Sequence, residues 1–349
     1  MRNTWMSRSI GVAVAVVAGL GQAPPGNAQS TGQTAQTASR PDANNGTLRF
    51  TFENDIFGGT DEGYTNGVRF DYVTPTNELP WLARKARESL LWMAEDGADW
   101  YATFSLGQNI YTPQDLLRRT PDPNDRPYGG FTYASIGLAA DSGYRLDTLA
   151  LDFGVVGRMA QADDVQRAVH DLIDADDPLG WDSQLRNEPA IRLVFERKYR
   201  FGYDFDLDFL DLQADAAPHF GLALGNVDTS GAAGFTFRFG DRLDDTFGPP
   251  RIRPAVASPG FYEPVDGIGW YVFSGIEARA VARNIFLDGN TFRDSPNVEP
   301  HRLVGDLSLG FALQYQDVEL SYTHVLRTPE FRGQRGFAQF GSMSISTRF

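Results

Sequence analysis

Few side chains in this sequence could act as a nucleophile or a base, because it has four histidines and no cysteine. His170 follows Gln166 by four positions, so a helix would place both side chains on one face. An imidazole titrates near neutral pH, which makes His170 a candidate general base beside an amide that could orient water or substrate. An exposed or packed helical histidine without a chemical role would fit the same pattern.

A second candidate site is a run of oxygen-bearing side chains. Glu53-Asn54-Asp55 is followed by Thr60-Asp61-Glu62 and then by Thr65-Asn66. Oxygen ligands clustered on a loop suit Ca2+, and Asn54 and Asp55 are the candidate ligands. The spacing is not that of an EF-hand, and a polar hairpin tip would have the same composition.

A serine nucleophile finds little support. The chain has no G-x-S-x-G motif, and no serine stands next to a histidine. A Ser-His esterase of another barrel type is therefore the weaker enzymatic alternative.

The elements that would position these residues are β-strands with alternating character. In the last segment Gly341, Met343, Ile345, Thr347 and Phe349 share one face, and serines with Arg348 share the other. This alternation suits a strand with lipid on one side and a polar lumen on the other. A soluble β-sandwich alternates similarly, but the number of such segments favours an all-β antiparallel transmembrane barrel.

The segments number about twelve, as a single-chain barrel with both termini on one side requires. They lie near 47–55, 64–73, 101–111, 129–141, 144–156, 189–202, 207–223, 231–240, 268–285, 302–315, 317–327 and 337–349.

Strand parity then predicts which connections are extracellular. These are 56–63, 112–128, 157–188, 224–230, 286–301 and 328–336. Asp141-Ser142-Gly143, Gly202–Asp206 and Tyr315-Gln316 fit short periplasmic turns, whereas 74–100 and 241–267 are long. Either these two are real periplasmic excursions, or the strand count is off by two.

One predicted extracellular connection contains a helix. From Gly157 to Ala175 the apolar positions follow helical spacing instead of alternating. Val165, Val169 and Leu172 form a stripe that can pack on the barrel wall, next to the face that carries Gln166 and His170.

The N-terminus has the pattern of a secretory signal peptide. Arg2 and Arg8 precede a short apolar run that ends in small residues, which predicts a signal peptide over 1–28. A polar leader over 29–46 and a barrel over 47–349 follow. The net charge of −14 argues against nucleic-acid binding, because phosphate contacts need Lys and Arg. An acidic surface would bind an anionic lipid through bridging divalent cations.

Several motifs together resemble one family. They are Phe52-Glu53-Asn54-Asp55, Tyr64-Thr65-Asn66-Gly67, Gly107 to Pro113, Asp125 to Gly130, Gly154 to Gly157, Gln166 with His170, and Trp181 with Asn187-Glu188-Pro189. In order and spacing they resemble the outer-membrane lipid A 3'-O-deacylase (LpxR) family, from about residue 47 to 200 and more weakly to the C-terminus.

The resemblance implies a twelve-stranded outer-membrane barrel. Its active site would lie on the extracellular side, between the outer wall and a loop helix. The implied reaction is hydrolysis of the 3'-linked acyloxyacyl chain of lipid A, with a histidine base and Ca2+ stabilising the oxyanion. The positions that match the family's functional residues are Asn54, Asp55, Thr65, Gln166 and His170.

Where the family has a functional lysine, this sequence has Arg118 or Arg119, which keeps a positive charge for lipid A phosphate or sugar. The implied partners are lipopolysaccharide, outer-membrane lipids and the barrel-assembly machinery, which would read the terminal Phe349. A porin-like or catalytically silent barrel is the alternative, although a porin has no use for a loop helix carrying Gln166 and His170.

Overall fold

Thirteen antiparallel strands make up most of the structure, a computed structural model that describes residues 46–58, 63–173, 176–204, 212–241, 243, 246–248, 262 and 265–349. The predicted signal peptide and nearly all of the predicted leader lie outside the described residues. So do residues 59–62 of the oxygen-rich run and the end of the predicted helix, 174–175.

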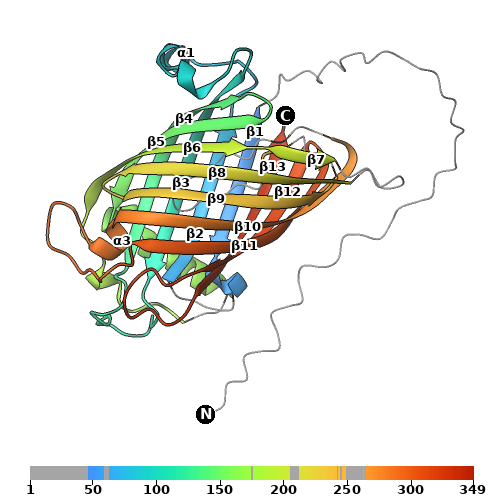
Figure 1. Ribbon diagram of the computed structural model, residues 1–349. Coiled ribbons are helices and arrows are strands. Elements are labelled where there is room, and N and C mark those ends of the chain that lie inside the picture. The colour runs from blue at the N-terminus through green and yellow to red at the C-terminus, as the bar shows by residue number, and fades with distance from the viewer. Residues whose placement is uncertain are drawn as a thin grey trace, which may run out of the picture. The chain divides into compact units, whose positions relative to one another are not determined.

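The strands close into a ring (Figure 1). Their bounds are β1 Thr47–Asn54, β2 Gly63–Val73, β3 Asp99–Thr112, β4 Gly129–Asp141, β5 Arg145–Val156, β6 Glu188–Tyr199, β7 Phe201–Asp204, β8 Gln213–Gly225, β9 Asp228–Gly240, β10 Val265–Asn284, β11 Leu303–Gln316, β12 Val318–Arg327 and β13 Ala338–Arg348. β1 pairs with β13, and both β6 and the short β7 pair with β8. β7 follows β6 after one residue and pairs with the same neighbour, so the two count as one interrupted strand. The barrel therefore has twelve strands, as predicted.

Short helices occupy the connections. They are η1 Asp55–Gly58, α1 Trp81–Ser89, η2 Leu91–Met93, η3 Arg158–Ala160, α2 Ala162–Ile173, η4 Trp181–Ser183 and α3 Ile285–Asp288. α2 confirms the predicted loop helix. No helix in the described part of the chain is long and apolar enough to cross a membrane.

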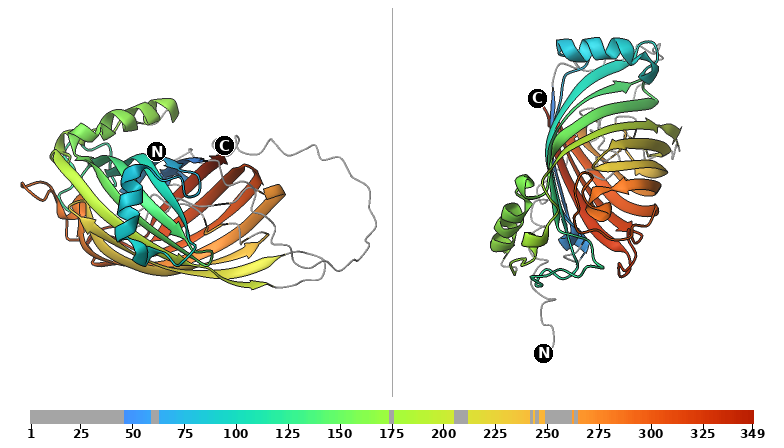
Figure 2. Two further views of the ribbon diagram at one scale, coloured as in Figure 1. Left: turned by 90° about the horizontal axis from the view of Figure 1, so that it is seen from above. Right: turned by 90° about the vertical axis from the view of Figure 1, so that its left-hand side faces the viewer.

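The two ends of the barrel carry different elements. At the end where β1 begins, which we call the terminal end, the amide of Phe349 donates to the carbonyl of Gly46. α1 lies at this end (Figure 1). At the other end, the loop end, α2 stands outside the wall, where it is the green helix in both views of Figure 2.

Three predictions about connections need correction. Gly202 to Asp204 is not a turn but belongs to β7, because this stretch goes on pairing with β8 after the break at Arg200. β8 begins at Gln213 and not near 207, and residues 207–211 are outside the described part. Tyr315 and Gln316 belong to β11, and the turn lies at Asp317, after a positive φ at Gln316. The long connection 74–98 is a real excursion that contains α1 and η2.

The alternation predicted from sequence matches the observed burial. Along β11, Leu307, Leu309 and Phe311 are exposed on the outer face, whereas Asp306 and Ser308 are buried in the lumen. Apolar side chains thus surround the wall and polar side chains line much of its interior, the pattern of a barrel whose solvent is lipid.

Many of the charged side chains in the lumen occur as ion pairs, which offset the cost of burying each charge. The pairs include Arg69–Asp71, Arg126–Glu330, Arg192–Asp152, Arg238–Asp215 and Arg327–Asp306. Arg327 donates from Nε and Nη2 to both carboxylate oxygens of Asp306, at 2.7 and 2.6 Å, in the bidentate geometry that arginine favours.

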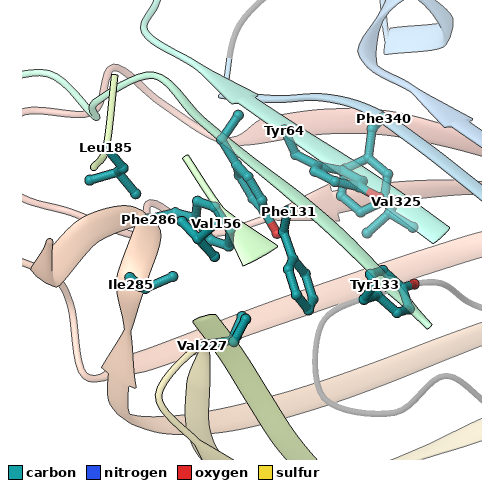
Figure 3. Packing of buried hydrophobic residues seen from close by; sticks show 12 residues of the cluster. Tyr64, Phe131, Tyr133, Val156, Leu185, Val227, Ile285, Phe286, Val325 and Phe340 are labelled. Carbon is teal, nitrogen blue, oxygen red and sulfur yellow. The ribbon is translucent and has the colours of Figure 1, made fainter. Parts of the chain in front are cut away.

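Apolar rings fill the lumen near the loop end (Figure 3). This lumen cluster contains Tyr64, Tyr111, Phe131, Tyr133, Val156, Leu185, Ala190, Val227, Ile285, Phe286, Val325 and Phe340. Most of its members come from strands on opposite sides of the ring, so they can meet only inside it. Phe286 of α3 stacks on Tyr111 with ring centroids 3.8 Å apart, which means that the loop after β10 folds inward.

We expect the buried ion pairs to dominate the effect of charge substitutions on barrel stability. Arg327→Gln would leave Asp306 buried without its cation and should cost about 3–5 kcal/mol of unfolding free energy. Arg332→Gln removes an exposed pair with Glu299, 3.1 Å apart, and should cost about 0–1 kcal/mol. Urea titration, followed by the gel-mobility difference between folded and boiled barrel, measures both. Equal urea midpoints of unfolding for the two variants would contradict a dominant role for the buried ion pairs.

Candidate active site on the outer wall

α2 lies on the outer face of β3 and β4 because a glycine lets it approach. A Cβ added at Gly130 would overlap the Cβ of Ala162, the first residue of α2. Around this contact a wall cluster forms from Ile110, Leu116, Tyr128, Ala162 and Trp181, with Val165 packed against it. The predicted apolar stripe of the helix is therefore confirmed at Val165.

Two polar side chains of the wall fix the turn that precedes α2. Gln108 of β3 and Thr132 of β4 both donate to the carbonyl oxygen of Ala160, at 2.7 and 2.8 Å. The chain enters this turn through Gly157, whose φ of 96° favours glycine, and a Cβ there would overlap the backbone of Arg186. The loop helix thus has a defined position along the wall.

A chain of hydrogen bonds orients the candidate base. The indole nitrogen of Trp181 can only donate, so the partner atom 2.8 Å away is the carbonyl oxygen of Gln166. The amide nitrogen of Gln166 then faces Nε2 of His170 at 3.4 Å. Because that nitrogen donates, Nε2 must be the accepting, unprotonated ring nitrogen.

The hydrogen bond of the other ring nitrogen, Nδ1, supports an unprotonated Nε2. Nδ1 of His170 lies 2.6 Å from the carbonyl oxygen of Asp176, which can only accept. Nδ1 therefore carries the proton, and Nε2 keeps the lone pair that a general base needs. The bond from Gln166 to Nε2 is long, so a water molecule can compete for that lone pair.

Both predicted helix residues are buried, at 2% exposure for Gln166 and 4% for His170. Both side chains are thus shielded from solvent, and the partners described above orient their polar atoms. Trp181 itself packs on Tyr128, with ring centroids 4.8 Å apart. The sequence placed His170 and Gln166 together correctly, and the structure adds Trp181 and Asp176, which hold them.

Asn54 and Asp55 lie where β1 ends at the loop end. The side-chain oxygen of Asn54 accepts from the amide of Ile56 at 2.8 Å and so caps η1. η1 folds over the outer face of β13, where Phe57 occupies the space beside Gly341 that a Cβ would need. Both Asn54 and Asp55 are buried.

Thr65 and Asn66 share the outer face because of a β-bulge. The register of β2 against β3 shifts between Tyr64 and Asn66, which leaves Thr65 as the extra residue. Tyr64 points into the lumen, whereas Thr65 shares a 2.5 Å hydroxyl contact with Thr112. The buried side-chain oxygen of Asn66 has no hydrogen-bond partner among the described residues.

Strand register relates these residues to the helix. Asn54 stands opposite Asn66, and Asn66 stands opposite Ile110, which belongs with Ala162 to the wall cluster. Ile110 is two strands from Asn54, roughly 10 Å at the usual strand spacing. The structure thus gathers all five predicted catalytic residues at the loop end of the β1–β4 wall.

Arg118 and Arg119 lie in the connection between β3 and β4, and both are exposed. Arg118 pairs with Asp122 at 3.4 Å. A hydrogen bond from the backbone amide of Asn124 lowers the pKa of Asp122, with Arg118 adding to the shift, so this carboxylate stays ionised. The connection is tied to the site, since the carbonyl of Leu116 accepts from the amide of Leu179 near Trp181.

The rim carries oxygen donors of the kind that Ca2+ binds. Asp55 supplies a carboxylate and Asn66 a buried amide oxygen with no partner in the described structure, which are the hard oxygen atoms that Ca2+ takes. No group of three or more histidine or acidic side chains suited to a metal occurs in the described residues. These donors fit Ca2+ in type, with water and substrate oxygens needed to complete its coordination.

A closed twelve-stranded barrel with an apolar outer face and a polar lumen defines the class, an outer-membrane β-barrel. The family model described as "Outer membrane protein LpxR" matches residues 13–349, so the chain belongs to the LpxR family and is an outer-membrane protein.

The structure of LpxR from Salmonella typhimurium is similar, with a TM-score of 0.71 and 20% identity over 87% of this chain and 100% of that one. The β domain of the Bordetella autotransporter BrkA reaches a TM-score of 0.43 at 10% identity, over 88% of this chain and 99% of that domain. No curated protein matches the sequence.

The hydrogen-bond chain makes a prediction about the tautomer of His170. Nitrogen NMR of histidine-labelled barrel should show neutral His170 protonated at Nδ1. Trp181→Phe removes the donor that orients Gln166 and should broaden or shift this signal. Trp270→Phe, a change on the lipid-facing wall, serves as the control and should leave it unchanged. A neutral His170 ring protonated at Nε2 would contradict the hydrogen-bond chain from Trp181 to Asp176.

Proposed function

We propose that this protein hydrolyses an acyl ester of lipid A, the 3'-linked acyloxyacyl chain, with His170 as the general base. The observation that carries the proposal is the chain Trp181–Gln166–His170–Asp176, which holds an unprotonated Nε2 on the outer wall of the barrel. A lipid substrate reaches that wall from the bilayer without entering the lumen. Membership of the LpxR family supports lipid A as the substrate class.

In the proposed reaction His170 transfers one proton from the attacking water to the leaving alkoxide. Nε2 takes a proton from water as the water oxygen attacks the ester carbonyl carbon. The tetrahedral intermediate then loses the sugar-side alkoxide when the C–O bond breaks. The imidazolium returns its proton to that alkoxide, which gives a hydroxyl group and a free acyl acid.

The remaining residues position the reactants. Gln166, held by Trp181, orients the attacking water, and Thr65 and Asn54 line the wall where the acyl ester would lie. Asp55 and Asn66 would hold Ca2+, with Asn54 as a further candidate. Bound there, the ion would supply positive charge for the developing oxyanion.

Arg118 and Arg119 would bind the phosphorylated sugar. Both are exposed in a connection tied to the η4 turn, and an arginine fork matches phosphate well. In this arrangement the loop end faces the cell exterior, where lipopolysaccharide resides, and the terminal end faces the periplasm. Recognition of Phe349 by the barrel-assembly machinery is part of the same proposal.

The porin-like alternative is less well supported. Aromatic side chains of the lumen cluster, with Phe286 stacked on Tyr111, occupy the interior at the loop end. A passive pore would need that space to be open to water.

His170→Ala should lower turnover by about 10²–10⁴-fold while the barrel stays folded. His219→Ala and His324→Ala are matched controls on strands and should behave like wild type. Mass spectrometry of lipid A from cells that carry each variant measures the effect. Wild-type turnover by His170→Ala would refute the mechanism.

Removal of calcium should abolish activity without unfolding the barrel. A chelator withdraws the ion that Asp55 would hold, and added Ca2+ should restore turnover. Asp55→Asn should need a higher Ca2+ concentration, whereas no concentration should rescue His170→Ala. Full activity in excess chelator, with unchanged gel mobility, would remove Ca2+ from the proposal.

A further inference from the structure

The connection between β2 and β3 is unusually long for the terminal end, and it does not hang free of the barrel. Its α1 and η2 segments cover a terminal cluster on the outer wall, formed by Leu79, Met93, Trp100, Ala102, Leu138 and Ala140. Ala83 and Leu90 pack against this cluster, and the guanidinium of Arg87 lies 5.3 Å from the ring centre of Trp100. One face of the segment is therefore fixed to the barrel.

The same segment also exposes large apolar side chains that nothing in the described structure covers. Trp81, Leu82, Leu91 and Trp92 are 55–62% exposed. An exposed group of two tryptophans and two leucines on a short helical segment marks a surface that contacts something apolar. Trp92 also lies against Phe195 of the outer wall, with ring centroids 5.2 Å apart, so this surface continues into the lipid-facing face of the barrel.

Outward-facing aromatic side chains ring the barrel at the terminal end, and the segment completes this aromatic girdle where the wall lacks them. Elsewhere at this level the wall supplies Tyr72, Trp270, Tyr315 and the terminal Phe349 on its outer face. Over β3 and β4 the wall's own residues at this level are buried under the segment, Trp100 and Ala140 among them. Trp81 and Trp92 take their place, and aromatic girdles mark the boundary between hydrocarbon and headgroups.

Basic side chains accompany the apolar ones. α1 carries Arg84, Lys85 and Arg87 against the single acid Glu88. Lys85 lies 5.5 Å from the ring centre of Trp81, so the cation and the indole are presented together. An indole at the hydrocarbon boundary with a cation beside it suits a leaflet that contains anionic phosphate headgroups.

We propose that the segment Trp81–Trp92 is an interfacial anchor that docks on the anionic phospholipid leaflet at the terminal end of the barrel. Trp81, Leu82, Leu91 and Trp92 insert at the acyl boundary, and Arg84 and Lys85 contact lipid phosphates. The inference is independent of catalysis, because it concerns the end of the wall opposite α2.

The absence of cysteine from the sequence allows a direct test by spin labelling. A nitroxide is attached at Leu82→Cys in the full barrel, reconstituted into vesicles of phosphatidylethanolamine with phosphatidylglycerol. Collision rates with oxygen, which concentrates in lipid, and with a water-soluble nickel chelate report the surroundings. Leu106→Cys on the exposed wall is the lipid control, and Asp96→Cys in the turn after η2 is the water control.

The Leu82 label should behave like the Leu106 label, with oxygen collisions exceeding nickel collisions, and the Asp96 label should show the reverse. Adding Arg84→Gln and Lys85→Gln should shift the Leu82 label toward nickel in the anionic vesicles but not in phosphatidylcholine. A Leu82 label that favours nickel would overturn the proposal. A label shielded from both reagents would overturn it too, because a protein partner would then cover the segment.

Discussion

Closure of the strand ring is the constraint on which the rest of this structure depends. Within lipid every backbone amide and carbonyl needs an internal partner, so β1 must pair with β13 and β6 with β8. A closed ring fixes which side chains face lipid and which face the lumen. The lumen side chains Asp306 and Arg327 must then neutralise each other, since neither can reach bulk water.

The same constraint explains how a polar site can exist on the lipid side of the wall. Polar groups there are tolerated only if they are covered and bonded, and α2 supplies the cover. Gly130 allows the helix to touch the wall, Gln108 satisfies the carbonyl of Ala160, and the bulge at Thr65 brings an extra polar residue to the outer face. The site is thus a local departure from alternation that the loop helix compensates.

The sequence predicted those parts of the fold that follow from periodicity. β4 was placed at its observed bounds, and Gln166 with His170 followed from helical spacing alone. The pairing of Trp181 with Gln166 was not predictable, because it joins residues across a loop whose path no periodicity encodes. α1 was missed for another reason: its tryptophan and leucine face outward, so its pattern is not that of a helix packed on a core.

α1 and α2 cover the two ends of the same strand, so their separation shows how far apart the two helices lie across the membrane. Trp100 under α1 and Ile110 under α2 both belong to β3. Along the strand they are about 33 Å apart, or about 25 Å across the membrane for a tilt near 40°. Between them Phe104 and Leu106 are exposed to lipid. The two helices therefore stand at opposite ends of the lipid-facing wall, and an anchor at α1 would fix how deep the candidate site lies in the membrane.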